Sequence, residues 1–176
     1  MSEPLISVIM PAYNADRFIA EAIGSVRGQT HENWELLILD DGSADSTCHL
    51  AERFAREDAR IRLLRNEKNM GVARTRNRGF DLCRGSYVAL LDADDLWHPD
   101  KLEKQLALLE QTGADFAYSA YAIVDPSGKK VKADYLVPET VNFRELLKEN
   151  VIGCSAVILR AELLKQHRFL TANVCI

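Results

Sequence analysis

Short apolar runs alternate with amphipathic segments through most of the chain, and this alternation constrains the fold more than any other feature. The runs have the length and the β-branched composition of buried strands. They are Leu5–Met10, Trp34–Leu39, Ile61–Leu64 and Tyr87–Leu91. Because strands joined by helical crossovers pair in parallel, the pattern predicts an α/β three-layer sandwich, with a mainly parallel central sheet and helices on both faces. The length of 176 residues fits a single domain that spans residues 1–176.

The segments between these runs carry apolar residues at helical spacing. Asn14 or Asp16 is expected to cap the first helix, and Asp45 or Ser46 is expected to begin the second. Proline is favourable in the first turn of a helix, which supports a helix start at Pro99. The third and fourth helices are predicted over Val72–Cys83 and Pro99–Glu110.

The rhythm of strands and helices changes after Gly113. The chain is expected to continue with a longer strand, a strong turn, a returning hairpin arm, a short helix and a last strand that leads into a helix from Ala161. These segments are Asp115–Val124, Asp125–Gly128, Lys130–Val137, Phe143–Lys148 and Ile152–Leu159.

The run Tyr87–Leu91 ends abruptly in three carboxylates, which are Asp92, Asp94 and Asp95. Clustered carboxylates repel each other and resist desolvation, so they need a compensating cation. Mg²⁺ takes oxygen ligands and is commonly shared between one or two carboxylates and the phosphates of a substrate. The loop is therefore predicted to bind a metal ion, and the alternative interpretation is a solvated acidic turn that caps the next helix.

Four polar loops follow strands or precede helices in this pattern, and the carboxyl edge of an open parallel sheet is where ligands bind. They are Pro11–Asn14, Asp40–Ser43, Asn69–Gly71 and Asp92–Asp95. Helix N-termini suit phosphate, and acidic side chains such as Asp40 and Asp41 suit a base or a ribose. The first strand is followed by neither a G-x-G-x-x-G nor a P-loop sequence, which argues against dinucleotide binding and P-loop chemistry.

Composition excludes some classes of function. The net charge of −4 gives no electrostatic case for nucleic acid, and no apolar run is long enough to span a bilayer. The acidic start Met1–Pro4 does not resemble a signal peptide, so a cytoplasmic location is expected. The four cysteines lack the spacing of a zinc site and are expected to be reduced structural thiols.

The order and spacing of four stretches resemble the family 2 glycosyltransferases, which adopt the GT-A fold. Each stretch is weak alone, but together they are specific and cover most of the chain up to Leu109. The stretches are Ser7–Asn14, Leu39–Thr47, Asn69–Asn77 and Leu91–Asp95.

The resemblance implies roles for individual residues. The nucleotide pocket would be lined by Pro11, Ala12, Tyr13 and Asn14. Asp41 would accept a hydrogen bond from the base, most often uracil in this family. Arg74 would lie beside the nucleotide, and Asp92, followed by Ala93, would approach the ribose. Asp94, with Asp95 as the competing candidate, would bind Mn²⁺ or Mg²⁺ that bridges the diphosphate and acts as a Lewis acid.

Several side chains near these loops have two interpretations. Arg74 and Arg78 are four residues apart and share a helix side, while Arg76 is expected to point elsewhere, so Arg74 is preferred as the ligand-facing arginine. Trp97 and His98 are expected either to flank an acceptor sugar or to pack at the edge of the fold.

One element that the resemblance implies is missing from this sequence. An inverting enzyme of this kind needs a general base, usually an Asp in a Glu-Asp pair shortly after the segment that matches Ile152–Leu164. No acidic residue follows Glu162, and His167 is the only substitute that we consider. The chain is therefore expected to be truncated at its C-terminus, and apolar surface left uncovered would favour a homodimer.

The expected function is transfer of a sugar from a nucleotide-diphosphate sugar, most simply a UDP-sugar, to a hydroxyl of a saccharide or lipid-linked acceptor in polysaccharide biosynthesis. The reaction would be metal-dependent and inverting, with at most peripheral contact with a membrane. The alternative is a non-catalytic nucleotide-binding fragment that lacks the general base. A sugar-phosphate nucleotidyltransferase shares a similar sheet, but it would show a glycine-rich loop with Arg and Lys where this chain has Pro11–Asp16.

Overall fold

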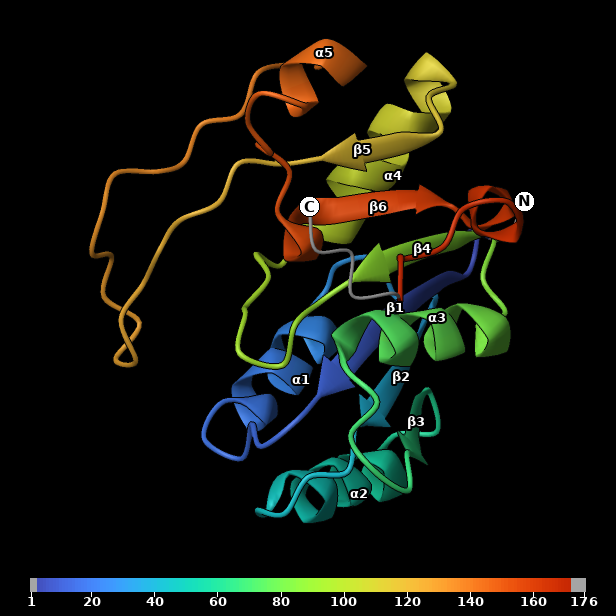
Figure 1. Ribbon diagram of the computed structural model, residues 1–176, viewed down its shortest axis with the longest axis vertical. Helices are drawn as coiled ribbons and strands as arrows, with labels where there is room; N and C mark the ends of the chain where they lie inside the picture. Colours follow the sequence, from blue (N-terminus) through green and yellow to red (C-terminus); the bar gives the residue numbers. More distant parts are fainter. Residues whose placement is uncertain (1–2, 172–176) are drawn as a thin grey trace.

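A twisted central sheet organises the molecule (Figure 1). The computed structural model describes residues 3–171, and within them the sheet has six strands in the order β3-β2-β1-β4-β6-β5. The first four of these are parallel to one another, while β6 runs antiparallel to β4 and β5 antiparallel to β6. The strands are β1 Ile6–Ala12, β2 Trp34–Asp40, β3 Ile61–Arg65, β4 Tyr87–Leu90, β5 Phe116–Tyr118 and β6 Val157–Arg160. The predicted mainly parallel α/β sandwich is confirmed.

Helices cover both faces of this sheet, and the sheet separates the core into two layers. Alternate side chains of β1 point to opposite faces, as the period of a strand requires. Ile6, Val8 and Met10 pack with α1 (Ile19–Arg27), α2 (Thr47–Glu57) and α4 (Lys101–Thr112) on one face, whereas Ile9 packs with Phe80 of α3 (Val72–Leu82) on the other. Among residues 3–171, no helix is both long and apolar enough to cross a bilayer.

The helix α3 lies unusually close to β1. A Cβ atom on Gly79 would lie 2.6 Å from Cγ2 of Ile9, so only glycine permits this approach. The close packing fixes α3 against the middle of the sheet and places its first turns beside the carboxyl ends of β1 and β2 (Figure 1).

The parallel register brings the ends of three strands to one edge. Ala12 lies opposite Asp40, and Ile9 lies opposite Leu90. The segments that follow β1, β2 and β4 therefore leave the sheet at the same edge, which we call the carboxyl edge. This is the edge at which the sequence predicts a ligand site.

The fold after α4 differs from the sequence expectation in several places. The prediction of a long strand over Asp115–Val124 is wrong. The strand β5 ends at Tyr118, which lies opposite Val157, where its partner β6 begins. Without a neighbouring strand, the chain leaves the sheet as a long arm (Figure 1), and Val124 is 45% exposed. The expected return of Lys130–Val137 is confirmed only as two isolated antiparallel bridges, Tyr121 with Tyr135 and Val124 with Lys130.

Other boundaries shift for local reasons. The fourth helix begins at Lys101, and the amide of Lys104 donates to the carbonyl of Asp100, so the start expected at Pro99 is wrong. The short helix α5 spans Phe143–Leu146. The strand expected from Ile152 begins only at Val157, because Cys154–Ala156 form the 3₁₀ turn η1, and the helix expected from Ala161 is the 3₁₀ turn η2 (Ala161–Lys165). Cys175 and the other residues of 172–176 lie outside the described residues, as do Met1 and Ser2.

Candidate functional site

The loops that follow β1 and β2 are joined by hydrogen bonds at the carboxyl edge. The amide of Asp41 donates to the carbonyl of Ala12 at 2.8 Å, and the amide of Asn14 donates to Oγ of Ser43 at 3.0 Å. In return, Oδ1 of Asn14 accepts from the amide of Ala44 at 3.0 Å. Asn14 has a φ of 49°, a left-handed conformation that asparagine tolerates better than most residues. Residue type and backbone geometry thus fix one loop against the other.

The same contacts correct the predicted cap of α1. The N-cap residue of that helix is Phe18, and no side chain caps it. Asn14 binds the β2 loop instead, and the backbone amide of Asp16 donates to Oδ2 of Asp45 at 3.2 Å. Ser46 is the N-cap residue of α2 as expected, although its side chain makes no capping bond.

Asp41 connects the β2 loop to the loop that precedes α3. Its Oδ1 accepts from Nδ2 of Asn66 at 2.7 Å and from the amide of Met70 at 2.9 Å, and its Oδ2 accepts from the amide of Gly71 at 2.9 Å. Burial alone would raise the pKa of the Asp41 carboxyl. The hydrogen bonds from Met70, Asn66, Thr75 and Gly71 outweigh burial and hold that pKa below its usual value.

Two glycines permit this arrangement. Gly42 has a φ of 77°, and a Cβ atom there would lie 2.9 Å from the backbone nitrogen of Asn69. Gly71 has a φ of 87° at the N-cap of α3, where its amide reaches Asp41. A side chain at Gly42 would collide with the loop before α3, whereas at Gly71 there is space for one and it is the left-handed φ that favours glycine.

The acidic loop after β4 is held by two side chains from elsewhere in the fold. Nη2 of Arg76, in α3, lies 2.5 Å from Oδ1 of Asp92. The hydroxyl of Ser155, in η1, accepts from the amide of Asp92 at 3.0 Å and donates to Oδ2 of Asp95 at 2.5 Å. The adjacent residues Thr75 and Arg76 of α3 therefore stand between Asp41 and Asp92.

The structure places the three arginines of α3 differently from expectation. Arg74 is exposed, and no contact of its side chain is described. Arg76, expected to point away, is 7% exposed and pairs with Asp92, and its Nε is buried without a hydrogen-bond partner. Nη1 of Arg78 donates to the carbonyl of Arg65 at 2.9 Å and also to Oδ1 of Asn66. Arg76 is thus the arginine that this structure brings to the acidic loop.

The remaining predicted residues divide into buried and open positions. Pro11, Ala12 and Ala93 are buried under the loops, and Tyr13 is 52% exposed beside them. Asp94 is exposed, and within the described part of the chain it has no hydrogen bond or ion pair. Within residues 3–171, Asp94 is therefore the one carboxylate of the acidic loop whose side chain makes no hydrogen bond or ion pair.

The donor set of this loop fits a hard divalent cation that is bound by few protein ligands. Asp95 is exposed, but partial desolvation by the protein around it raises its pKa, the neighbouring carboxylates of Asp94 and Asp92 add to this rise, and the hydrogen bond from Ser155 opposes it. A cation would relieve that repulsion. Within residues 3–171, no three His, Cys, Asp or Glu side chains are grouped to hold a metal ion. One or two carboxylates with substrate phosphates and water remain the arrangement that Mg²⁺ commonly uses.

Three further candidates lie away from the acidic carboxylates or serve the fold. Trp97 is 7% exposed, and its Nε1 donates to the carbonyl of Ser155 at 2.7 Å, which matches the packing interpretation. His98 is exposed and pairs with Asp100 at 2.6 Å. His167 precedes Arg168, which pairs with Asp81 in the last turn of α3, and within residues 3–171 no hydrogen bond or ion pair joins the His167 side chain to the acidic loop.

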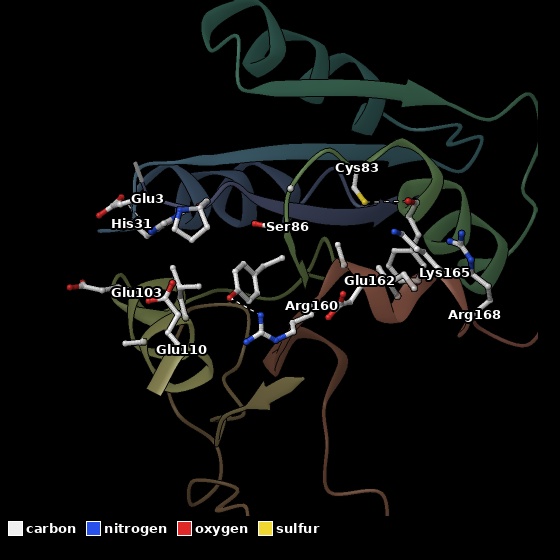
Figure 2. Close-up of a pocket in the computed structure, with 18 residues that line it drawn as sticks. Glu3, His31, Cys83, Ser86, Glu103, Glu110, Arg160, Glu162, Lys165 and Arg168 are labelled. Atoms are coloured by element: carbon white, nitrogen blue, oxygen red, sulfur yellow. Dashed lines mark hydrogen bonds and ion pairs between the residues drawn. The ribbon is translucent and has the colours of Figure 1, made fainter. Parts of the chain in front are cut away.

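A separate groove of about 1060 Å³ lies near the opposite ends of β1 and β4 (Figure 2). Glu103 and Glu110 of α4 line one side, and Lys165 lines the other. Several charged groups in it are already paired, for example His31 with Glu3 at 3.5 Å. The groove contains none of the carboxylates that the sequence predicts for the site.

Sequence reasoning missed four side chains that organise the carboxyl edge, namely Ser43, Asn66, Arg76 and Ser155. Ser43 and Arg76 lie inside the stretches that carry the family resemblance, so their positions were available. Asn66 precedes such a stretch by three residues, and Ser155 lies 60 residues beyond Asp95. No local pattern marks a serine in an apolar segment as a partner of a distant acidic loop.

Comparison with known proteins supports the family resemblance. The chain is 38% identical over 169 residues to an Escherichia coli protein named UDP-Glc:alpha-D-GlcNAc-diphosphoundecaprenol beta-1,3-glucosyltransferase WfgD, covering 96% of this chain and 65% of that protein. It is 37% identical over 160 residues to the Bacillus subtilis glycosyltransferase TuaG, named for teichuronic acid biosynthesis, covering 91% of this chain and 64% of that protein. The chain thus spans slightly less than two thirds of the length of these relatives.

Solved structures share the fold. Staphylococcus aureus TarS (residues 1–349) in complex with UDP superposes with a TM-score of 0.76 at 24% identity, covering 91% of this chain and 48% of that chain. The mannosyltransferase PcManGT from Pyrobaculum calidifontis, in complex with GDP-Man and Mn²⁺, gives a TM-score of 0.69 at 22% identity, covering 97% and 48%. The sequence pattern of glycosyl transferase family 2 matches residues 7–168, so this chain belongs to glycosyl transferase family 2.

Proposed function

We propose that this chain is the donor-binding part of a glycosyltransferase that transfers a sugar from a UDP-sugar to a hydroxyl of a saccharide or lipid-linked acceptor. The observation that carries the proposal is the joining of four loops at the carboxyl edge by Asp41, Arg76 and Ser155. Such an edge is where an open α/β sheet binds its ligand. The family membership and the printed name of the E. coli relative support the choice of reaction and of UDP.

The nucleotide would lie across the loops that follow β1 and β2. Tyr13 is exposed there and offers an aromatic face to a base, while Pro11, Ala12 and Asn14 shape the floor. Asp41 already accepts hydrogen bonds from Asn66, Met70 and Gly71, the Thr75 hydroxyl also stabilises its anion, and a carboxylate has only about four lone-pair positions. We therefore propose that the main role of Asp41 is to hold the loops together and that it offers at most one further hydrogen bond to a base. Arg74 is a separate proposed neighbour of the nucleotide.

A divalent cation, Mn²⁺ or Mg²⁺, would be held by Asp94, with Asp95 as the competing ligand and the donor diphosphate completing the shell. Asp92 is paired with Arg76 and would orient the ribose, next to Ala93. When bound, the cation neutralises the charge that develops on the departing nucleoside diphosphate. The acceptor hydroxyl would attack the anomeric carbon with inversion as the bond to the nucleoside diphosphate breaks, and its proton would go to a general base that we assign to no described residue of this chain.

Calorimetry with UDP, in the presence and absence of Mn²⁺, tests the donor site. We expect wild-type protein to bind UDP more tightly with Mn²⁺, and Asp94→Ala to lose that difference. Asp115→Ala removes an exposed carboxylate beside Arg160 and serves as the matched control. Metal-independent UDP binding, or equal binding by the Asp94→Ala protein, would reject the metal assignment, and titration with GDP tests the choice of nucleotide.

Sugar transfer needs its own assay. Hydrolysis or transfer from radiolabelled UDP-sugars, followed with candidate saccharide acceptors, separates an active transferase from a protein that only binds nucleotide. Binding of Mn²⁺-UDP without any release of sugar would favour the non-catalytic nucleotide-binding alternative. Turnover that disappears in the Asp94→Ala protein would support the transferase.

A further inference from the structure

A single hydroxyl contacts both ends of the acidic loop. Oγ of Ser155 accepts from the amide of Asp92 at 3.0 Å and donates to Oδ2 of Asp95 at 2.5 Å. The two acidic residues are three positions apart, and the amide of Asp95 also donates to the carbonyl of Asp92 at 3.1 Å. The loop is therefore a tight turn whose two ends are joined through one side chain from a distant segment.

The segment that carries Ser155 is itself held in place by hydrogen bonds from two side chains. The carbonyl of Ser155 accepts from Nε1 of Trp97 at 2.7 Å, and the carbonyl of Ala156 accepts from Nε2 of Gln105 at 2.8 Å. Oε1 of Gln105 in turn accepts from the buried Nζ of Lys101 at 2.7 Å. These contacts anchor η1 to α4 and to Trp97, two residues beyond the acidic loop, so the hydroxyl is held in a defined place.

We propose that Ser155 is a positioning residue that sets which carboxylate of the acidic loop is free to bind a cation. It occupies Oδ2 of Asp95, while within residues 3–171 neither side-chain oxygen of the exposed Asp94 has a hydrogen-bond partner. The inference rests on the proposed metal-dependent donor site and selects Asp94 over Asp95 as its main protein ligand. Ser155 is not expected to touch the nucleotide or the sugar.

Removal of the hydroxyl should loosen the loop without breaking the fold. In Ser155→Ala, the amide of Asp92 and one oxygen of Asp95 lose their partner, and water replaces it because the site is partly exposed. Asp95 would then be free to turn toward Asp94, and the cation would meet a mobile set of carboxylates. Residues that orient metal ligands typically contribute about 10- to 100-fold in metal affinity.

The first test measures Mn²⁺-dependent UDP binding by calorimetry. We expect Ser155→Ala to bind UDP in the presence of Mn²⁺ about tenfold more weakly than wild type, and Ser155→Thr, which keeps a hydroxyl, to recover most of that loss. Ser25→Ala is the matched control, since Ser25 is also half-buried and its hydroxyl donates to the carbonyl of Ala22 within its own helix, α1. Equal affinities of wild type and Ser155→Ala would overturn the proposal.

A second readout does not depend on metal or nucleotide. Amide hydrogen exchange measured by NMR should become about tenfold faster at Asp92 in Ser155→Ala, while exchange at Ala89, in the paired part of β4, stays unchanged. Faster exchange throughout β4 and β6 would indicate a purely structural role and would overturn the proposal. If Ser155→Ala loses the circular dichroism spectrum of wild type, Ser155→Cys, which keeps the volume but donates only weakly, takes its place.

The two readouts separate the possible failures. If wild-type protein binds no UDP with Mn²⁺, the proposed donor site fails, and exchange at Asp92 still decides whether Ser155 holds the loop. If wild type binds and Ser155→Ala binds equally well, the donor site stands and the role of Ser155 fails.

Discussion

Two buried carboxylates lie at opposite ends of β2, and their partners differ in charge. Glu35, near the start of the strand, is 2% exposed and lies 2.7 Å from Nη2 of Arg84 and 3.4 Å from Nη1 of Arg62. Asp41, just after the end of the strand, is 3% exposed and accepts from backbone amides and from Asn66. Within residues 3–171, no Lys, Arg or His side chain pairs with Asp41.

We propose that the difference separates a carboxylate that serves stability from one that belongs to a ligand site. Both carboxyls have a lowered pKa, so both are held as anions by the fold. The anion of Glu35 is neutralised by its own arginines. At the carboxyl edge Asp92 is paired with Arg76, whereas within residues 3–171 no cationic side chain pairs with Asp41, Asp94 or Asp95, so a cation would be their natural partner. The following predictions test this division, from the largest effect to the smallest.

The largest effect is expected at Asp94. We expect Asp94→Asn to weaken Mn²⁺-dependent UDP binding by about 100-fold or more, because a bound cation contributes several kcal/mol to an anionic ligand. Asp95→Asn should have a smaller effect, of about tenfold or less, since an amide oxygen can still accept from Ser155. Calorimetry of both proteins at equal Mn²⁺ concentration measures the ratio. A larger loss in Asp95→Asn than in Asp94→Asn would reverse the assignment of the main ligand.

Glu35→Gln should affect stability and leave binding intact. The carboxylate accepts from Ser7, from the amide of Arg84 and from two guanidinium groups, and an amide cannot satisfy all of these donors. We expect a loss of about 2 kcal/mol in the free energy of unfolding, measured by urea denaturation. The affinity for Mn²⁺-UDP should change by less than about twofold. A large loss of affinity would show that the two ends of β2 are coupled.

The sequence predicts the fold much better than it predicts the internal contacts of the site. Apolar runs and helical spacing determine β1 to β4 and the helices between them, since these depend on local patterns. The end of β5 at Tyr118 could not be predicted, because it depends on where β6 begins, in a distant segment. The stretches around Asp41 and Asp92 contain residues that the fold brings to one edge of the sheet. Their internal partners, such as Ser155, depend on tertiary contacts that no spacing encodes.

The arginines of α3 illustrate the same limit and give the next prediction. Helical spacing favours Arg74, whereas the fold buries Arg76 against Asp92, because α3 approaches β1 closely at Gly79. We expect Arg76→Gln to weaken UDP binding by about tenfold, since Asp92 loses a charged hydrogen bond. Arg74→Gln, on an exposed side chain of the same helix, is the matched comparison and should change affinity by about twofold or less. A larger loss of UDP affinity in Arg74→Gln than in Arg76→Gln would support Arg74 as the ligand-facing arginine.

The smallest effect concerns the pH dependence of the free energy of unfolding. Mutation of Glu35 and of Asp41 separates the contributions of the two ends of β2 to this dependence. The folded-state pKa of Glu35 lies below its ordinary value of 4.5, and that of Asp41 lies below 3.8. Each carboxylate therefore contributes stability that is fully present above those values and is lost as the pH falls through the folded-state pKa. Urea unfolding of wild type between about pH 6 and pH 3 should show this decline.

Removal of either carboxylate should flatten that decline, because the variant no longer takes up the corresponding proton on unfolding. Glu35→Gln and Asp41→Asn should flatten it separately, and the double variant should flatten it additively, because the two groups share no partner. Only Asp41→Asn should also weaken UDP binding at about pH 7, since it releases the amides of Met70 and Gly71 from the loop before α3. If Asp41→Asn leaves UDP binding unchanged while flattening the pH dependence, then Asp41, like Glu35, serves only the stability of the fold.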